Sequence, residues 1–287
     1  MNYIQLSISV SDPNAIDFVL ADLHDHPVES LEINDLVVCA YIPINLYETI
    51  NLHDFPLTLK VCSISIKSEE IEHENWNIEW ESSFPPVFID KKVLVKGPFH
   101  FDLDLNLFDY VIEMTPKMSF GTGHHPTTYL MMIGLLKHDL SGKRILDMGC
   151  GTAILAVLAI KAGADYAIGV DIDPYSSLNA IEILEVNNVS EQAIIHTGGA
   201  ELISPRGIAH GPYDFIFANI NRNILLTDME SYSKASNNGG ILELSGFYNK
   251  DVNPILKRAK DCGYILAGKA SKEGWIHLTL TYQPENT

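Results

Sequence analysis

A predicted strand, a turn with two glycines and an apolar helix follow one another in residues 143–160. This succession constrains the fold more than any other feature of the chain. The strand ends around Asp147, and Gly149 and Gly151 follow at once. Glycine has no Cβ, so the turn can take positive φ angles and a ligand can lie directly against its backbone. The pattern predicts a buried parallel strand, a tight loop and a helix start.

A second acidic residue, Asp171, ends the next apolar run, residues 166–170. A carboxylate at this place can hold the two hydroxyls of a ribose by charge-assisted hydrogen bonds. The dinucleotide fingerprint requires a third glycine, but Ile154 stands there, and Asp147 occupies a strand end that is otherwise apolar. The sequence therefore favours a nucleoside ligand without a pyrophosphate. S-adenosylmethionine fits that description better than NAD does.

The acidity of the chain restricts its partners. Its 287 residues include 37 acidic and 19 basic side chains, which give a formal net charge of −18. Direct nucleic-acid binding is not expected, because phosphate contacts need a basic surface. Two interpretations of the charge stay open: it attracts a basic partner, or it only keeps the protein soluble.

The cysteines and the N-terminus predict a cytoplasmic protein. Cys39, Cys62, Cys150 and Cys262 lie far apart, without the paired spacing of a zinc site or a disulfide framework. Residues 1–5 lack the basic and apolar stretches of a signal peptide. No apolar run approaches the roughly 20 residues that a membrane span needs.

Residues 1–67 predict a small α+β domain. Alternating apolar residues indicate a strand at 3–10, and Ser11 or Asp12 is suited to cap a helix that runs to residue 23. Further elements are predicted as strands at 30–33, 36–42 and 57–66 and a short helix at 46–52. This βαββαβ order is typical of a ferredoxin-like sandwich. No catalytic cluster is evident in it, so it is interpreted either as a binding module or as a structural cap.

A strongly acidic segment, residues 68–84, joins this domain to the rest of the chain. Trp76 and Trp80 have i,i+4 spacing, which predicts a linker helix that packs both rings onto a domain. Residues 85–287 then alternate predicted strands and helices and end in two strands of a hairpin. This alternation predicts an α/β domain with a doubly wound, mostly parallel sheet and an antiparallel strand at or near one edge.

The boundaries in this larger domain follow from the apolar runs. Strands are expected at 87–89, 93–96, 110–113, 193–196, 213–219, 241–244, 264–267 and 276–282, and helices from 126, from 174, at 224–235 and at 252–261.

Residues 120–128 form a second glycine-containing loop, with Pro126 in the first turn of the following helix. The free N–H groups of a helix N-terminus suit an anion such as the carboxylate of the cofactor's methionine part, and Thr128 adds a hydroxyl. His124 and His125 are adjacent, so their side chains point in different directions, and no third metal ligand is evident. We therefore predict no metal site.

The strand at 213–219 ends in Asn219, at the edge where ligands of open α/β sheets bind. Its side-chain carbonyl can accept a hydrogen bond from an amine and so hold the lone pair toward a methyl donor. The alternative is a turn residue at a strand end. Because Asp147, Gly149 and Asp171 precede it, we interpret Asn219 as the residue that orients the acceptor amine.

Four motifs occur in a fixed order in the larger domain: F-G-T-G-H-H-P-T-T at 120–128, L-D-M-G-C-G at 146–151, G-V-D-I-D-P at 169–174 and F-A-N-I at 217–220. Together they resemble the methyltransferases of large-subunit ribosomal protein eleven, the PrmA family. The resemblance implies a class I S-adenosylmethionine-dependent enzyme that methylates lysine ε-amino and N-terminal α-amino groups of that basic ribosomal protein. It also implies that the small domain is the substrate-recognition module.

By this resemblance, the cofactor contacts fall on Thr128, Gly149, Asp171 and Asn219, with Phe120, Asp147, Gly151 and Ile172 as neighbouring candidates. The chain departs from the family pattern in three places: His124 replaces a threonine, Ala153 replaces a glycine, and Asn-Arg-Asn at 221–223 replaces a smaller and less charged segment. The first two departures are expected to preserve cofactor binding. The third departure, at 221–223, concerns how the substrate is recognised.

Three other functions compete with this one. A related methyltransferase would act on another protein, a small amine or glutamine. The absence of an Asn-Pro-Pro-Tyr motif at Asn219 disfavours glutamine alone. An NAD-dependent oxidoreductase would need glycine in place of Ile154. A non-catalytic cofactor-binding protein would need neither Asn219 nor the 120–128 loop, so their presence favours an enzyme.

Overall fold

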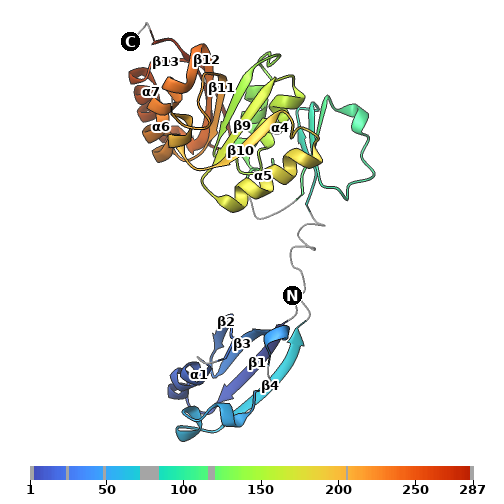
Figure 1. The fold of residues 1–287 in the computed structure, drawn as a ribbon, viewed down its shortest axis with the longest axis vertical. Coiled ribbons are helices and arrows are strands. Elements are labelled where there is room, and N and C mark those ends of the chain that lie inside the picture. Colours follow the sequence, from blue (N-terminus) through green and yellow to red (C-terminus); the bar gives the residue numbers. More distant parts are fainter. Residues whose placement is uncertain are drawn as a thin grey trace. The chain divides into compact units, whose positions relative to one another are not determined.

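The computed structural model describes residues 3–23, 26–47, 50–71, 84–115, 120–204 and 206–284. The chain divides into two compact units, Met1–Glu79 and Trp80–Thr287 (Figure 1). Within the described ranges, no helix is both long and apolar enough to cross a membrane.

In its described residues, the smaller unit is a four-stranded antiparallel sheet with one α-helix. Its elements are β1 (Tyr3–Val10), α1 (Ile16–Leu23), β2 (Ser30–Asn34), β3 (Val37–Pro43) and β4 (Ile64–Ile71). The strand order is β2-β3-β1-β4, which is the order of a ferredoxin-like sheet. Every second residue of β1 is buried, as predicted from its alternation. The carboxylate of Asp12 caps the turn before α1 by accepting from the Asn14 N–H at 2.9 Å.

Two elements predicted in this unit are wrong. Short 3-10 helices at Ile44–Leu46 and Leu52–Asp54 replace the helix predicted at 46–52. The strand predicted at 57–66 begins only at Ile64, after another 3-10 helix at Thr58–Lys60. The cause is long-range: the buried carboxylate of Asp22 accepts the Thr58 N–H at 2.8 Å and the Thr58 hydroxyl at 2.7 Å, which holds this segment in a turn.

The prediction of a linker helix at 68–84 is wrong for its first four residues. Residues 68–71 belong to β4, which pairs with β1 as far as Ile71. Residues 72–83, with Trp76 and Trp80, lie outside the described residues. The predicted domain limits at residues 67 and 84 stay predictions.

The larger unit is built on a seven-stranded sheet. Its strands are β8 (Arg144–Met148), β9 (Tyr166–Asp171), β10 (Ala193–Thr197), β11 (Tyr213–Asn219), β12 (Ser236–Tyr248), β13 (Tyr264–Lys272) and β14 (Trp275–Tyr282). Their order is β10-β9-β8-β11-β12-β14-β13, and only the pairs made by β14 are antiparallel. The predicted mostly parallel sheet with an antiparallel strand near one edge is confirmed.

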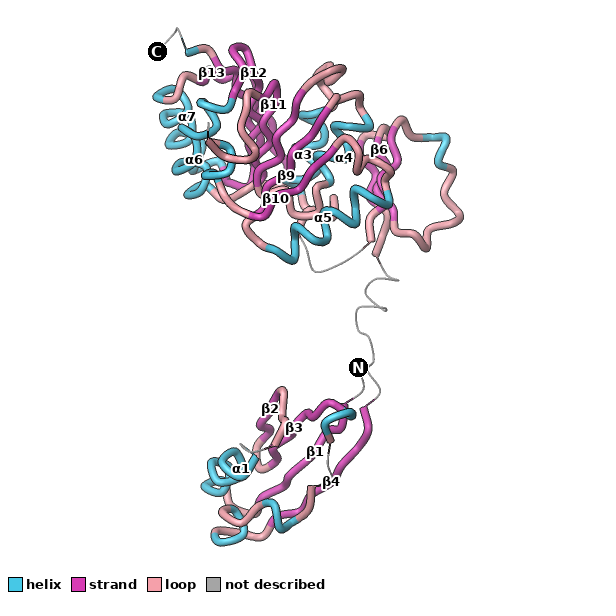
Figure 2. Tube along the Cα trace, in the orientation of Figure 1, coloured by secondary structure: helices cyan, strands magenta, loops and turns pink. Residues whose placement is uncertain are grey.

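Helices cover both faces of this sheet. Figure 2 shows α6 (Arg222–Ala235) and α7 (Val252–Asp261) packed together on one face, and α3 (Pro126–Leu135), α4 (Ile154–Lys161) and α5 (Pro174–Val186) on the other. A separate three-stranded sheet consists of β5 (Val87–Ile89), β6 (Val93–Lys96) and β7 (Tyr110–Glu113). The layers are those of a doubly wound α/β fold.

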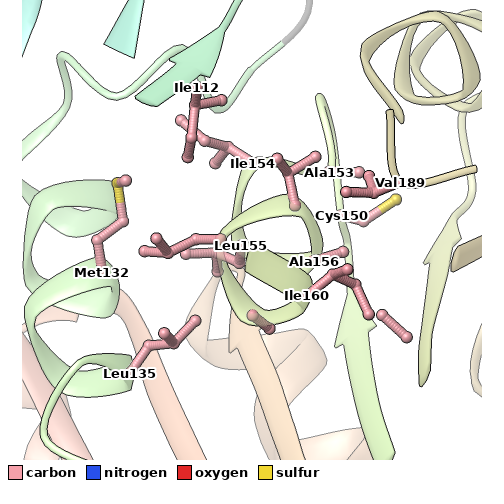
Figure 3. Close-up of a cluster of buried hydrophobic side chains, with 14 of the residues drawn as sticks. Ile112, Met132, Leu135, Cys150, Ala153, Ile154, Leu155, Ala156, Ile160 and Val189 are labelled. Carbon is pink, nitrogen blue, oxygen red and sulfur yellow. The ribbon is translucent and has the colours of Figure 1, made fainter. Parts of the chain in front are cut away.

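Helix α4 is buried nearly all round, which explains its uninterrupted apolar sequence. Figure 3 shows Leu155 and Ile160 of α4 among side chains from neighbouring elements, including Met132 and Leu135 of α3 and Ile112 of β7. No side chain caps its N-terminus, and the preceding Ala153 has a left-handed backbone with φ +58°. The helix that follows the glycine loop is therefore positioned by the core and by the loop itself.

A buried charged cluster fixes α3 against the sheet. The carboxylate of Glu243 on β12 contacts His138 Nε2 at 2.7 Å and pairs with His277 of β14. Burial alone would raise the pKa of Glu243, but the two histidines outweigh it and lower the pKa to about 2. A Cβ on Gly134 would lie 2.6 Å from the His277 ring, so only glycine lets α3 approach this closely. The C-terminal end of α3 is thereby held in a defined place.

Candidate functional site

The predicted site residues lie where the strand order reverses. The chain passes from β8 to β9 on one side and later returns to form β11 on the other side of β8. Open α/β sheets bind ligands at this switch point, at the carboxyl ends of the strands. Asp147 pairs in register with Phe217 of β11 and with Gly169 of β9, so Asp147, Asp171 and Asn219 share one edge.

The glycines of the loop after β8 permit a tight turn. Gly149 has φ +65° and Gly151 has φ +53°. A Cβ at Gly149 would collide with the side chain of Ile220, and one at Gly151 would collide with the Phe120 carbonyl. The loop is fixed further by the Gly149 N–H, which donates to the Val170 carbonyl at 2.8 Å. This is the backbone geometry that the sequence predicted for a loop in contact with a ligand.

Asp171 is fixed by two backbone hydrogen bonds. One carboxylate oxygen accepts from the Gly151 N–H at 2.8 Å and the other from the Asp173 N–H at 3.0 Å. Each carboxylate oxygen can accept more than one hydrogen bond, so the group keeps capacity for a diol. The next residue, Ile172, is 80% exposed beside it. Their roles toward a ribose and a base stay predictions.

The loop at residues 120–128 packs on the glycine loop. The Thr152 N–H donates to the Phe120 carbonyl at 3.1 Å, and the Thr152 hydroxyl donates to the Gly121 carbonyl at 2.7 Å. His125 caps α3, because its Nδ1 accepts the Thr127 N–H at 3.3 Å. Thr128 therefore lies in the first turn of a helix whose start is tied to the site.

Among the described residues, three buried polar atoms at this edge have no hydrogen-bond partner: Thr128 Oγ1, Asp147 Oδ2 and Asn219 Oδ1. Buried polar atoms in proteins are nearly always paired, because an unpaired one costs about 1–3 kcal/mol. These atoms come from α3, β8 and β11, and all three residues were predicted from the sequence. Their open hydrogen-bonding capacity fits a ligand rich in polar groups, such as S-adenosylmethionine.

The electrostatics of Asp147 are unusual. Burial raises the pKa of its carboxyl to about 7, a backbone hydrogen bond from Ala156 opposes this rise, and the charge of Asp171 adds to it. A cation beside Asp147 would favour the ionised form. The α-ammonium of S-adenosylmethionine would be such a cation.

The two histidines of the loop serve structural roles. His124 Nδ1 lies 3.1 Å from the Thr122 hydroxyl and its Nε2 lies 3.0 Å from the Pro85 carbonyl. His125 Nδ1 is used in the cap of α3. In the part of the chain that the structure describes, no group of three or more His, Cys, Asp or Glu side chains is placed to hold a metal ion.

Sequence reasoning missed two aromatic residues near the site, Tyr248 and Trp275. They are register partners at the ends of β12 and β14, and their rings stack at 4.1 Å. In the sequence, only the predicted antiparallel pairing of the last strand indicated that these two residues could meet. Trp275 also contacts His125, with ring centroids 4.8 Å apart.

Comparison with known proteins gives consistent matches over most of the chain. A family model described as "Ribosomal protein L11 methyltransferase (PrmA)" matches residues 6–283. A ribosomal protein L11 methyltransferase of Porphyromonas gingivalis is 40% identical over 274 residues, which cover 93% of this chain and 91% of that protein. One from Bacteroides fragilis is 38% identical over 264 residues, with 90% of this chain and 91% of that protein covered.

A solved structure supports the same fold. The crystal structure of ribosomal protein L11 methylase from Lactobacillus delbrueckii subsp. bulgaricus matches with a TM-score of 0.62 at 22% identity, covering 70% of this chain and 98% of that one. The match of the family model to residues 6–283 and the identity to curated relatives over nine-tenths of the chain agree with the motifs and with the strand order. The chain belongs to the ribosomal protein L11 methyltransferase (PrmA) family.

Proposed function

We propose that this protein transfers methyl groups from S-adenosylmethionine to lysine ε-amino and N-terminal α-amino groups of ribosomal protein L11. The observation that carries the proposal is the set of unpartnered buried atoms on Thr128, Asp147 and Asn219 at the switch point of the sheet. A substrate named in several relatives supports the acceptor. Because that acceptor is a ribosomal protein, we place the enzyme in the cytoplasm.

Most of the predicted site residues are proposed to hold the cofactor. Asp171 accepts hydrogen bonds from the ribose hydroxyls, and Gly149 and Gly151 let the ligand lie against the backbone. The N-terminus of α3 and the Thr128 hydroxyl bind the carboxylate of the methionine part. Asp147 offers its open oxygen to the ammonium group. The bound cofactor supplies an electrophilic methyl group on a sulfonium.

The protein contributes to the reaction by aligning the acceptor amine with the methyl group of the cofactor. Displacement at the methyl carbon is in line, so the lone pair of a neutral amine must point at that carbon. The Asn219 carbonyl accepts an N–H of the amine and turns the lone pair toward the donor. A free lysine is protonated at neutral pH, and desolvation of the amine on entering the site would favour loss of that proton, which water accepts.

The smaller unit is proposed to recognise the protein substrate. Its edge strand β2 is exposed along its whole length, and within the described part of the unit it pairs only with β3. Leu31 and Ile33 on that strand are 46% and 49% exposed. An unpaired strand edge with apolar side chains is a surface that another chain can join. The net charge of −18 favours a basic partner and speeds the encounter, an effect that salt weakens.

A coupled assay tests the proposal. The full chain is incubated with S-adenosylmethionine and either ribosomal protein L11 or hen lysozyme, a basic protein that serves as control, and release of S-adenosylhomocysteine is followed. We expect release of S-adenosylhomocysteine with L11 and none with lysozyme. Equal release with both proteins would contradict the proposed substrate, and no release despite cofactor binding would contradict the proposed reaction with L11.

A further inference from the structure

The strand β13 forms one edge of the seven-stranded sheet, and helix α7 packs against it (Figure 1). In the part of the chain that the structure describes, β13 pairs with β14 alone, so its other side is open. The Gln283 N–H donates to the Gly263 carbonyl at 2.7 Å, and hydrogen-bonded pairs alternate along an antiparallel pair of strands. Tyr264 and Leu266 therefore direct their backbone N–H and C=O groups toward the open side.

An apolar cavity of about 370 Å³ lies beside this open edge, between α7 and β13. Its lining includes Leu256 and Ala259 of α7, Leu266 of β13 and Leu280 of β14. Leu266 is 45% exposed, although it shares a face of the sheet with the buried Leu280, its register partner. Proteins bind extended peptides at such places, because the peptide backbone pairs with the strand edge and an alternate side chain enters the cavity.

The surface around the cavity is basic, in contrast to the chain as a whole. Residues 252–272 contain five basic side chains and one acidic side chain, whereas the whole chain contains 19 basic and 37 acidic ones. Lys257 and Lys260 are exposed one turn apart on α7, and Lys269 is exposed on β13. Among the described residues, none of these three lysines forms a salt bridge. Their charge is therefore available to the carboxylates of a partner.

The same surface disfavours two other occupants. Pairing of β13 with the β13 of a second copy would bring lysines of the two chains together, and the register shift between Leu266 and Gly268 interrupts the edge. A nucleic-acid strand would need exposed rings for stacking, but Tyr264, which lines the cavity, is only 2% exposed. An acidic polypeptide matches the backbone edge, the apolar cavity and the charge together.

The cavity lies away from the cofactor edge of the sheet. Asn219 at the end of β11 is level with Ser245 of β12. Leu280 in the cavity wall is level with Leu242, which lies three residues earlier on β12. The strands β12 and β14 also separate β11 from β13. A partner bound beside β13 need not enter the cofactor site.

We propose that the β13 groove, defined as the open edge of β13 at Tyr264 and Leu266 with the neighbouring cavity, binds an extended acidic segment of another protein. The segment adds a strand to β13, and one of its apolar side chains enters the cavity. Carboxylates on either side of that side chain contact Lys257, Lys260 and Lys269. The inference is independent of the proposed function, because it requires neither S-adenosylmethionine nor L11.

Three blocked nonapeptides test the groove by NMR on the full chain. ETETLTETE places glutamates and one leucine on the same face of a strand, KTKTLTKTK reverses the charges, and ETETSTETE replaces the leucine by serine. We expect ETETLTETE to shift the amide signals of Tyr264 and Leu266 and to bind about tenfold more tightly than either other peptide. Because the chain has a net charge of −18, non-specific attraction would favour the basic peptide. Equal affinity for the acidic and basic peptides, or no shift of these amides at millimolar ETETLTETE, would overturn the proposal.

Charge reversal on α7 then locates the preference. The double variant Lys257→Glu, Lys260→Glu is expected to bind ETETLTETE about tenfold more weakly than the wild type. Lys92→Glu, at an exposed position in the turn between β5 and β6, is the matched control and should change the affinity by less than about twofold. Unchanged affinity in the double variant would overturn the proposal. If circular dichroism shows that this variant is unfolded, Lys269→Glu replaces it, with a loss of about threefold expected.

Sedimentation velocity of the full chain tests the remaining occupant, a second copy of the chain. We expect a monomer at the protein concentration used for NMR. A dimer that the Lys257→Glu, Lys260→Glu variant dissociates would show that a second copy fills the groove, and it would overturn the proposal of an acidic partner.

Discussion

The carboxylate of Asp171 accepts a hydrogen bond from the Gly151 N–H at 2.8 Å, which joins the end of β9 to the loop after β8. A second backbone hydrogen bond, from Asp173, holds the other oxygen at 3.0 Å. The acid is therefore oriented before a ligand arrives, and binding need not order it. Such preorganisation raises affinity because less conformational freedom is lost on binding.

Replacing this carboxylate by an amide should weaken the cofactor site. Asp171→Asn keeps an oxygen for the Gly151 N–H but removes the charge that strengthens hydrogen bonds to the ribose. We expect roughly 10- to 100-fold weaker binding of S-adenosylhomocysteine by calorimetry. Asp165→Asn, at an exposed position before the same strand, is the control and should bind normally. Equal affinity of Asp171→Asn and wild type would show that Asp171 does not contact the ligand.

Loss of the amide at the end of β11 should affect turnover. Asn219→Ala removes the carbonyl assigned to the acceptor amine, and we expect kcat to fall by about 100-fold, the size seen when a single aligned hydrogen-bonding group is removed. The dissociation constant of S-adenosylhomocysteine should change by no more than about threefold. Asn238→Ala, at an exposed position near the opposite end of β12, is the control. Comparable losses in kcat and in cofactor affinity would contradict an orienting role.

The buried carboxyl of Asp147 should make stability depend on pH in the absence of cofactor. Its pKa is raised from 3.8 to about 7, so between these values the folded chain holds a proton that the unfolded chain has released. The contribution of this group to stability therefore falls as pH rises from about 4 to about 7, by an amount on the order of 4 kcal/mol. Asp147→Asn removes this dependence.

Urea unfolding of wild type and Asp147→Asn at pH 5 and pH 8 measures the effect. The variant should gain stability relative to wild type at pH 8 compared with pH 5. A stability difference that is the same at both pH values would mean that Asp147 titrates normally in the folded chain.

The site could be predicted from sequence because its signals are local. Gly149 and Gly151 follow a strand directly, and the loop geometry depends on residues a few positions apart. Asp171 and Asn219 end apolar strands, and parallel strands bring their carboxyl ends to one edge whatever the loops between them. The mostly parallel, doubly wound sheet and its antiparallel strand near one edge followed from the same alternation.

The features that sequence reasoning missed depend on contacts between distant residues. The sequence pattern predicted that residues 57–63 belong to a strand, but the carboxylate of Asp22 holds Thr58 in a turn. The sequence does not reveal that Asp22 and Thr58 meet. The strand predicted at 241–244 is the middle of a longer one, β12, which begins at Ser236. The stacked rings of Tyr248 and Trp275 meet through the pairing of β12 with β14, and these strands are separated by another strand in the sequence.

Removal of the smaller unit should separate cofactor binding from protein methylation. A chain of residues 80–287 retains the whole seven-stranded sheet and every predicted cofactor contact. We expect it to bind S-adenosylhomocysteine within about threefold of the full chain, because the ligand contacts persist. It should fail to methylate L11. Methylation at the full-chain rate would show that the smaller unit does not recognise the substrate.

Intact-mass spectrometry of purified ribosomal protein L11, after incubation with this protein and S-adenosylmethionine, tests the central claim most directly. We predict a ladder of masses separated by one CH₂ group, with the additions mapped by fragmentation to lysine side chains and the N-terminal amine. The Asn219→Ala protein, incubated alongside, should give far less product. An unchanged mass of L11, from a protein that binds S-adenosylhomocysteine by calorimetry, would contradict the claim that L11 is the acceptor.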